Sequence, residues 1–179
     1  MGGPPASIRV AGPADAAALL ELKQRLDRET PFMMFEPGER DSSAADLATE
    51  LGRSAGSPNS VVIVADAGDH LAGYTELTGG SFRRSRTTAY VILGVLAGDA
   101  GHGLGAALLR AATNWAAEHG LHRLELTVMA HNTRAIGLYE RMGFTVEGRR
   151  TECLIVDGQF VDELHMAAII TPGRRANPL

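Results

Sequence analysis

Three glycines near the middle of the chain stand where backbone groups could bind a negatively charged ligand. Gly101, Gly103 and Gly105 lie in a segment, 94–106, that leads from an apolar stretch into an Ala-rich one. They leave N–H groups unshielded where a helix is expected to begin, and the positive end of the helix dipole favours phosphate. The spacing therefore predicts a phosphate site, with a tight strand-to-helix connection as the alternative.

The two best-known phosphate loops do not fit this segment. A Walker loop needs Gly-Lys-Ser or Gly-Lys-Thr after its spacer, and no such tripeptide occurs. The dinucleotide motif Gly-x-Gly-x-x-Gly fails because residues 104–106 read Leu-Gly-Ala after Gly103. His122 and Arg123 stand about twenty residues on, where a ribose would need an acidic residue. A different nucleotide enzyme that uses the glycine loop is therefore kept only as an alternative.

A second segment, residues 132–144, combines a helix with a chemically useful side chain. Asn132 can cap the helix start, and Gly143 suits a left-handed helix end. The apolar stripe of this helix consists of Ala135, Leu138, Tyr139 and Met142. Tyr139 is therefore either a buried packing residue or a hydroxyl held in place for chemistry.

Both segments resemble one family. Residues 100–106 resemble the pyrophosphate loop of the GNAT N-acetyltransferase superfamily, Arg/Gln-x-x-Gly-x-Gly/Ala, with Gly103 and Gly105 matching and Ala100 departing. Residues 132–144 are similar to the family's Asn-x-x-Ala-x-x-Leu-Tyr-x-x-x-Gly-Phe signature in both spacing and residue type. Residues 157–163 are similar to the closing hairpin of the ribosomal-protein-alanine-acetyltransferase-like branch. The resemblance covers about residues 6–170 in element order.

The resemblance implies an N-acetyltransferase with acetyl-CoA as co-substrate, in which a primary amine attacks the thioester directly without an acyl-enzyme. Such transfer needs a cofactor groove, a donor to the carbonyl, a base for the ammonium and an acid for the thiolate. Tyr139 would be the acid, because a phenol with a reference pKa of about 10 stays protonated near neutrality. The implied acetyl-CoA contacts are Leu93, Gly94 and Val95 at the pantetheine arm, Gly101, His102, Gly103, Leu104, Gly105 and Ala106 at the pyrophosphate, and Asn132 at the cofactor arm.

The base is not indicated by either motif. Some relatives carry a carboxylate on the strand that enters the loop, but residues 87–95 contain none, and Ala89 stands about where it would be. Glu76 on the preceding strand is the nearest candidate, with a solvated strand residue as the alternative reading. A chain of water molecules could serve instead. An inactive acyl-CoA-binding or sensor module is the alternative function, because Ala100 and the missing carboxylate both depart from the family pattern.

The acceptor site is expected in the loop over residues 30–41, which lines that site in relatives. Glu36 and Glu39 would suit a cationic amine, and the alternative is an ordinary charged loop. The apolar run Phe32 to Phe35 either packs as core or lines the acceptor pocket. The acceptor itself, a small-molecule amine or a protein N-terminus, is not identified by the sequence.

The elements that position these residues follow from hydrophobic periodicity and turn residues. Strands are predicted over 7–11, 61–65, 71–78, 87–95, 123–128, 145–156 and 160–170, and helices over 12–28, 43–54, 104–120 and 132–143. The crossover from 87–95 to 122–129 joins parallel strands, whereas the hairpins around it are antiparallel. The expected fold class is α+β (mixed α/β), a GNAT-like fold whose mixed, mostly antiparallel central sheet has helices on both faces.

Composition narrows the function further. The chain has 179 residues, 17 Lys+Arg against 21 Asp+Glu, and 45% hydrophobic residues, which excludes general disorder. We expect one N-acetyltransferase domain over 6–171 with flexible tails at 1–5 and 172–179, no signal peptide or membrane span, and a cytoplasmic location. The acidic balance gives no reason to bind nucleic acid or membrane, and the cluster Arg83, Arg84 and Arg86 is too small to change that. No metal site is expected, Cys153 is not assigned as a nucleophile, and a homodimer is expected by resemblance only.

Overall fold

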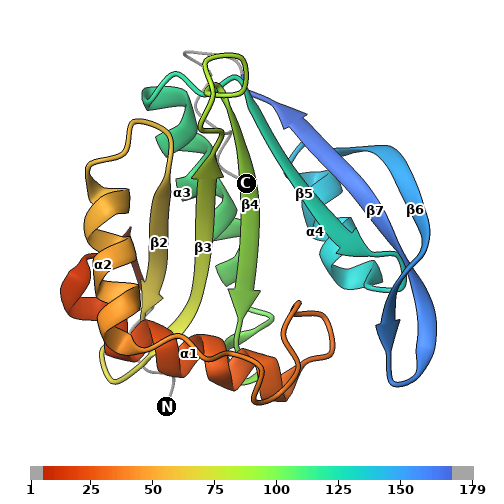
Figure 1. The fold of residues 1–179 in the computed structure, drawn as a ribbon, viewed down its shortest axis with the longest axis horizontal. Helices are drawn as coiled ribbons and strands as arrows, with labels where there is room; N and C mark the ends of the chain where they lie inside the picture. The colour runs from red at the N-terminus through yellow and green to blue at the C-terminus, as the bar shows by residue number, and fades with distance from the viewer. Residues whose placement is uncertain (1–5, 171–179) are drawn as a thin grey trace.

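The computed structural model describes residues 6–170, which form one mixed sheet with helices on both faces (Figure 1). Its strand order is β1-β2-β3-β4-β5-β7-β6. The strands are β1 Ser7–Val10, β2 Val61–Asp66, β3 Leu71–Gly79, β4 Thr88–Val95, β5 Arg123–Met129, β6 Thr145–Val156 and β7 Gln159–Ile169. The α-helices are α1 Ala16–Glu29, α2 Ala44–Ala55, α3 Leu104–Glu118 and α4 Thr133–Arg141, and short 3₁₀ turns occupy Pro13–Asp15 and Ala97–Asp99.

The pairing of the strands confirms the predicted fold class. β4 and β5 are parallel, and all other neighbouring strands are antiparallel. The parallel register runs only from Thr88 opposite Arg123 to Tyr90 opposite Glu125, and beyond it the two strands diverge (Figure 1). The predicted turn between β6 and β7 is also confirmed, because Asp157 and Gly158 both have positive φ angles, as a tight hairpin requires.

Two hydrophobic layers enclose the sheet. Helices α1 and α2 cover one face of β1 to β4, where Leu19, Leu26 and Leu51 pack on Val64 and Tyr74. Helices α3 and α4 cover the opposite face of the sheet with residues such as Leu108, Ala112 and Tyr139. Among the described residues, no helix covers β5, β7 and β6 on the α1 side (Figure 1). This leaves part of the sheet open beside the point where β4 and β5 diverge.

The start of the first helix differs from the prediction. The chain forms a 3₁₀ turn over Pro13–Asp15 before the α-helix begins at Ala16. The tighter turn forms because Asp15 donates its N–H to the carbonyl of Gly12, while its carboxylate accepts the Gly12 N–H and two guanidinium bonds from Arg9. The predicted capping box of the second helix is present, with Ser43 and Asp46 bonded reciprocally.

The predicted tails, 1–5 and 172–179, lie outside the described residues. Within residues 6–170, no helix is long and apolar enough to cross a membrane.

Candidate active site

The candidate site begins where β4 stops pairing with β5. After Tyr90, residues 91–95 of β4 keep their pairing with β3 but have no pairing with β5. The Tyr90 side chain spans the start of this opening, since its hydroxyl lies 2.7 Å from the hydroxyl of Thr127 on β5 and accepts the Thr127 N–H at 3.2 Å. An unpaired strand edge offers backbone donors and acceptors to an extended ligand. The predicted contacts Leu93, Gly94 and Val95 lie on this edge.

The glycine-rich segment lies directly after this edge and starts α3. Gly101 and Gly103 have φ angles of +97° and +78°, and a Cβ atom added to either would meet no heavy atom within 4 Å. The first bond of the helix runs from the N–H of Ala107 to the carbonyl of Gly103. The N–H groups of Leu104, Gly105 and Ala106 precede that bond, so they are the free donors that a helix N-terminus offers to an anion. This anion loop, residues 101–106, therefore has the form of an open, backbone-lined anion site.

Two glycines in this region are required by packing. A Cβ on Gly94 would lie 2.6 Å from Leu26 of α1 and 3.0 Å from Tyr74, so α1 could not approach β4 as closely. A Cβ on Gly105 would lie 3.0 Å from Leu138 of α4. Sequence reasoning gave these glycines a cofactor role only. The structure shows that they also set the distances between the helices and the sheet.

Asn132 and Tyr139 lie on α4, behind the opening. The Asn132 side-chain oxygen accepts the N–H of Ala135 at 3.1 Å, so the predicted helix cap is confirmed, and the amide nitrogen is not used by that cap. Tyr139 is 7% exposed and packs in the same core as Leu93 and Val95. Burial raises the pKa of Tyr139 to about 12, with a smaller contribution from the nearby Tyr90 phenol. Its hydroxyl therefore stays protonated throughout the physiological range.

A cavity of about 470 Å³ opens between the end of α1, the loop that follows it and the tip of the β6–β7 hairpin. Its walls come from three parts of the chain: Asp27, Arg28, Glu29, Thr30 and Pro31; Met33, Met34, Phe35, Glu36 and Pro37; and Met129, Leu154, Ile155, Val156 and Asp157. Met33, Met34 and Phe35 of the apolar run 32–35 therefore line this cavity, and Met33 also packs against the core under α1. The predicted acceptor residue Glu36 lies in this wall, beside thioether, aromatic and aliphatic side chains.

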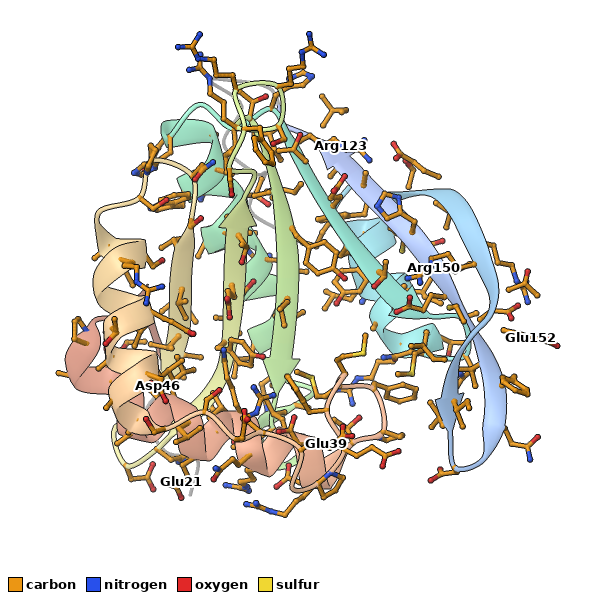
Figure 2. The ribbon with its side chains drawn as sticks, in the orientation of Figure 1. Glu21, Glu39, Asp46, Arg123, Arg150 and Glu152 are labelled. Atoms are coloured by element: carbon orange, nitrogen blue, oxygen red, sulfur yellow. The ribbon has the colours of Figure 1, made fainter. Side chains whose placement is uncertain are left out.

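Glu39 has a different place from Glu36. Its carboxylate accepts the backbone N–H of Glu36 at 2.9 Å, and it is not among the residues that line the cavity. Figure 2 shows Glu39 on the loop beside α1. The two predicted acidic residues are therefore close together, with Glu36 in the cavity wall and Glu39 holding the loop that carries it.

A buried ion pair that the sequence did not indicate fixes the same loop. Arg40 donates to both carboxylate oxygens of Asp27, at 2.7 and 3.0 Å, and Asp27 is only 4% exposed. The Arg40 guanidinium also lies 4.5 Å from the centre of the Phe35 ring. Asp27 raises the pKa of Arg40, which keeps the guanidinium charged. This pair anchors the loop to α1 and holds one wall of the cavity.

Glu76, the predicted base, lies on the α1 side of β3 and is not among the cavity residues. Its carboxylate accepts a hydrogen bond from the ammonium of Lys23 at 3.0 Å. Lys23 itself is 8% exposed and lies over the Tyr74 ring. The structure thus places Glu76 opposite Ile92 of β4, with its charge already paired.

An unpaired strand edge that leads into a helix start with free N–H groups, with a buried tyrosine behind it and a cavity in front, is the arrangement of an acyl-CoA-dependent acetyltransferase. The acetyltransferase (GNAT) family model matches residues 21–144, and the chain belongs to this family. The resemblance read from the two motifs is therefore confirmed. The family's co-substrate is acetyl-CoA.

Similar proteins agree with this assignment. The chain is 31% identical over 111 residues to a mycothiol acetyltransferase from Pseudarthrobacter chlorophenolicus, a match that covers 61% of this chain and 34% of that protein. The match thus spans about a third of the length of this curated relative. A GNAT acetyltransferase from Streptococcus pneumoniae has a TM-score of 0.89 at 29% identity, covering 92% of this chain and 99% of the other. The YncA protein of Salmonella typhimurium, solved with its cofactor acetyl-CoA, has a TM-score of 0.82 at 23% identity and covers 97% of each chain.

Proposed function

We propose that this chain transfers the acetyl group of acetyl-CoA to a primary amine by direct attack on the thioester. The observation that carries the proposal is the opening between β4 and β5. The anion loop follows the free edge of β4, Tyr139 packs in the same core cluster as Leu93 and Val95 of that edge, and the cavity lies on the α1 side of the sheet. Two substrates can therefore meet there from opposite sides.

On the cofactor side, the pantetheine arm is proposed to pair with the free edge of β4 at Leu93, Gly94 and Val95. The pyrophosphate would accept N–H groups from residues 101–106, with His102 exposed beside it. Positive φ angles at Gly101 and Gly103 support this fit, because they turn the backbone without placing a side chain in the anion's path. The amide nitrogen of Asn132 would reach the cofactor arm. The pantetheine and pyrophosphate contacts use mainly main-chain groups, so Ala100 in place of Arg or Gln leaves the principal donors in place.

In the transfer, the amine nitrogen forms a bond to the carbonyl carbon as the bond from that carbon to sulfur breaks. Tyr139 would donate a hydrogen bond to the departing sulfur. A thiol has a reference pKa of about 8.5, so a phenol with a pKa of about 12 keeps its proton and stabilises the thiolate by hydrogen bonding. Glu76 is the sequence-based candidate for the base that takes the amine's proton, although Lys23 already binds its carboxylate.

The acceptor is proposed to be a small amine with an apolar portion and a positive charge. The cavity volume lies in the range of about 300–1,000 Å³ that is typical of small-molecule sites. Glu36 and Asp157 bring negative charge to a wall that is otherwise rich in methionine and aliphatic side chains. The curated relatives are named for mycothiol, which also favours a small molecule over a protein N-terminus. We also propose a cytoplasmic location and a homodimer. The homodimer is supported by the exposed apolar side chains of Ile155 and Phe160, which lie opposite each other on β6 and β7.

The experiment that tests the proposal combines turnover with ligand binding. Purified protein is given acetyl-CoA and a panel of amines, and the released thiol and the acetylated product are measured. We expect thiol release that depends on one or more of the amines, and a higher Tm with CoA but not with ATP or NAD. A Tm increase with CoA but no turnover on any amine would instead support an acyl-CoA sensor. Stabilisation by ATP or NAD alone would indicate a different nucleotide enzyme.

A further inference from the structure

The open face of β5, β7 and β6 carries a charged cluster next to the opening between β4 and β5. Arg123 bridges two carboxylates, with its Nε 3.0 Å from Glu125 and a terminal nitrogen 2.5 Å from Glu147. His165 of β7 lies between the same two carboxylates, its Nε2 3.9 Å from Glu125 and its Nδ1 3.9 Å from Glu147. Figure 2 labels Arg123 on this part of the sheet. Neither sequence motif includes any of these four residues.

The imidazole of His165 lies among charged side chains. The charged groups that face the imidazole are Arg123 and Glu125 from β5 and Glu147 from β6, one positive and two negative charges. Arg123 lowers the pKa of Glu147, so that carboxylate stays ionised. The next carboxylate along β7, Glu163, is paired with Arg150. Arg123, Glu125 and Glu147 together leave one negative charge in excess beside the imidazole, so a positive charge that forms there lies next to an opposite charge.

Two hydroxyls lie between the opening and this histidine. The Tyr90 and Thr127 oxygens are 2.7 Å apart, and either can be the donor. Thr127 lies directly opposite His165 in the antiparallel pairing of β5 and β7. Side chains at directly opposite positions share one face of the sheet, with Cβ atoms about 5 Å apart. Tyr90 is the last residue of β4 that pairs with β5, so this path begins at the edge of the opening.

We infer that the proton lost by the acceptor amine leaves through Tyr90 and Thr127 to His165. The inference rests on the proposed amine acetylation. The ammonium passes a proton to the Tyr90 oxygen as the Tyr90 hydroxyl proton moves to Thr127, and the Thr127 proton moves to the imidazole. One proton is transferred in total: the ammonium becomes a neutral amine, the imidazole becomes an imidazolium, and both hydroxyls are restored. His165 acts through the two hydroxyls, so it is a positioning and proton-accepting residue that does not touch the substrate.

The test is the pH profile of kcat/KM for the amine, measured for the wild type, His165→Gln and the control His122→Gln. His122 is an exposed histidine outside both the opening and the cluster. We expect His165→Gln to lower kcat/KM at neutral pH about a hundredfold, the usual scale of a lost proton acceptor, and to remove the acid limb. His122→Gln should keep the wild-type profile, and KM for acetyl-CoA should be the same in all three proteins.

The hydroxyls give an independent measurement on the same path. Tyr90→Phe and Thr127→Val should each lower kcat/KM, and Thr127→Ser should restore most of the rate because it keeps the hydroxyl. Adding Thr127→Val to His165→Gln should cost little more than either change alone, since both interrupt one route. The Tm of every variant is measured, and His165→Asn replaces the glutamine variant if that one does not fold.

Wild-type kcat/KM and an unchanged acid limb in His165→Gln would overturn the inference. Loss of the acid limb in Glu76→Gln, with a normal profile in His165→Gln, would assign the proton to Glu76. If the wild type acetylates no amine, the proposed function fails, and the relay fails with it. If the wild type is active and only the His165 result is negative, the relay alone is wrong.

Discussion

Tyr139 is the residue with the most specific predicted chemical role. Its side chain is 7% exposed, its pKa is raised to about 12, and its ring packs on Phe144 with centroids 5.8 Å apart. Tyr139→Phe keeps the ring and removes one hydroxyl, so core packing should survive. If that hydroxyl stabilises the leaving thiolate, kcat and kcat/KM should fall together by about a hundredfold, with CoA affinity nearly unchanged. Steady-state rates and Tm measure the two effects separately.

Tyr74 provides a matched control for Tyr139. It is also a buried tyrosine, 2% exposed, but it lies under α1 and away from the anion loop. Tyr74→Phe should therefore leave turnover close to that of the wild type. A stable Tyr139→Phe protein with more than half the normal rate, in an assay limited by chemistry, would show that the hydroxyl has no part in the transfer.

At the residue scale, the sequence predicted a role for those residues that stand in a local pattern. The glycines of the loop, Asn132 and Tyr139 stand at fixed spacings within single elements. Asp27 and Arg40 could not be paired in advance, because one faces inward from a helix and the other follows in an irregular loop. Sequence reasoning also treated Glu36 and Glu39 as equivalent, although only the folded loop distinguishes the carboxylate in the cavity wall from the one that bonds to the backbone.

At the scale of the element, two substitutions at Gly103 test the anion loop. Gly103 has a φ of +78° and open space where a Cβ would lie, so Asn, which tolerates this conformation, should be accepted with a small loss of stability. Gly103→Glu adds a carboxylate in front of the free N–H groups and should weaken CoA binding by about a hundredfold or more through like-charge repulsion. Calorimetry with both variants measures this difference. Equal CoA affinity in the two folded proteins would mean that the pyrophosphate binds elsewhere.

The loop between α1 and α2 supports a prediction about the acceptor. Glu36→Gln removes a negative charge from the cavity wall and should raise KM for a cationic amine about fivefold, the effect of roughly 1 kcal/mol, while CoA affinity stays the same. Glu21→Gln serves as the control, because Glu21 is an exposed residue of α1 that points away from the cavity (Figure 2). Amine saturation curves for both variants give the comparison. Unchanged KM in Glu36→Gln would return this glutamate to an ordinary surface role.

For the whole molecule, the sequence predicted the element order and the parallel crossover, but not the position of the last hairpin. Either strand of an antiparallel hairpin could pair with β5, and hydrophobic alternation does not choose between them. The structure places β7 beside β5 and β6 at the edge, where irregular pairing between Arg150 and Leu154 interrupts the register. The sequence also did not predict the opening between β4 and β5, because the opening arises from strand divergence and not from any residue type.

The acid stability of the molecule depends on how its edge strand is attached. Arg9 of β1 bonds to Asp15 before α1 and to Asp66 of β2, and these bonds hold the pKa of both carboxyls below the ordinary value of 3.8. A carboxyl with a lowered folded pKa stabilises the fold above its unfolded pKa, and the effect is lost as the pH falls through the folded value. Arg9→Gln should therefore lower Tm at pH 7, and the difference from the wild type should shrink steadily below about pH 4. The control Arg53→Gln, at an exposed position of α2, should follow the wild-type curve. A constant difference between wild type and Arg9→Gln from pH 7 to pH 2 would show that Arg9 acts through packing and not through its two carboxylates.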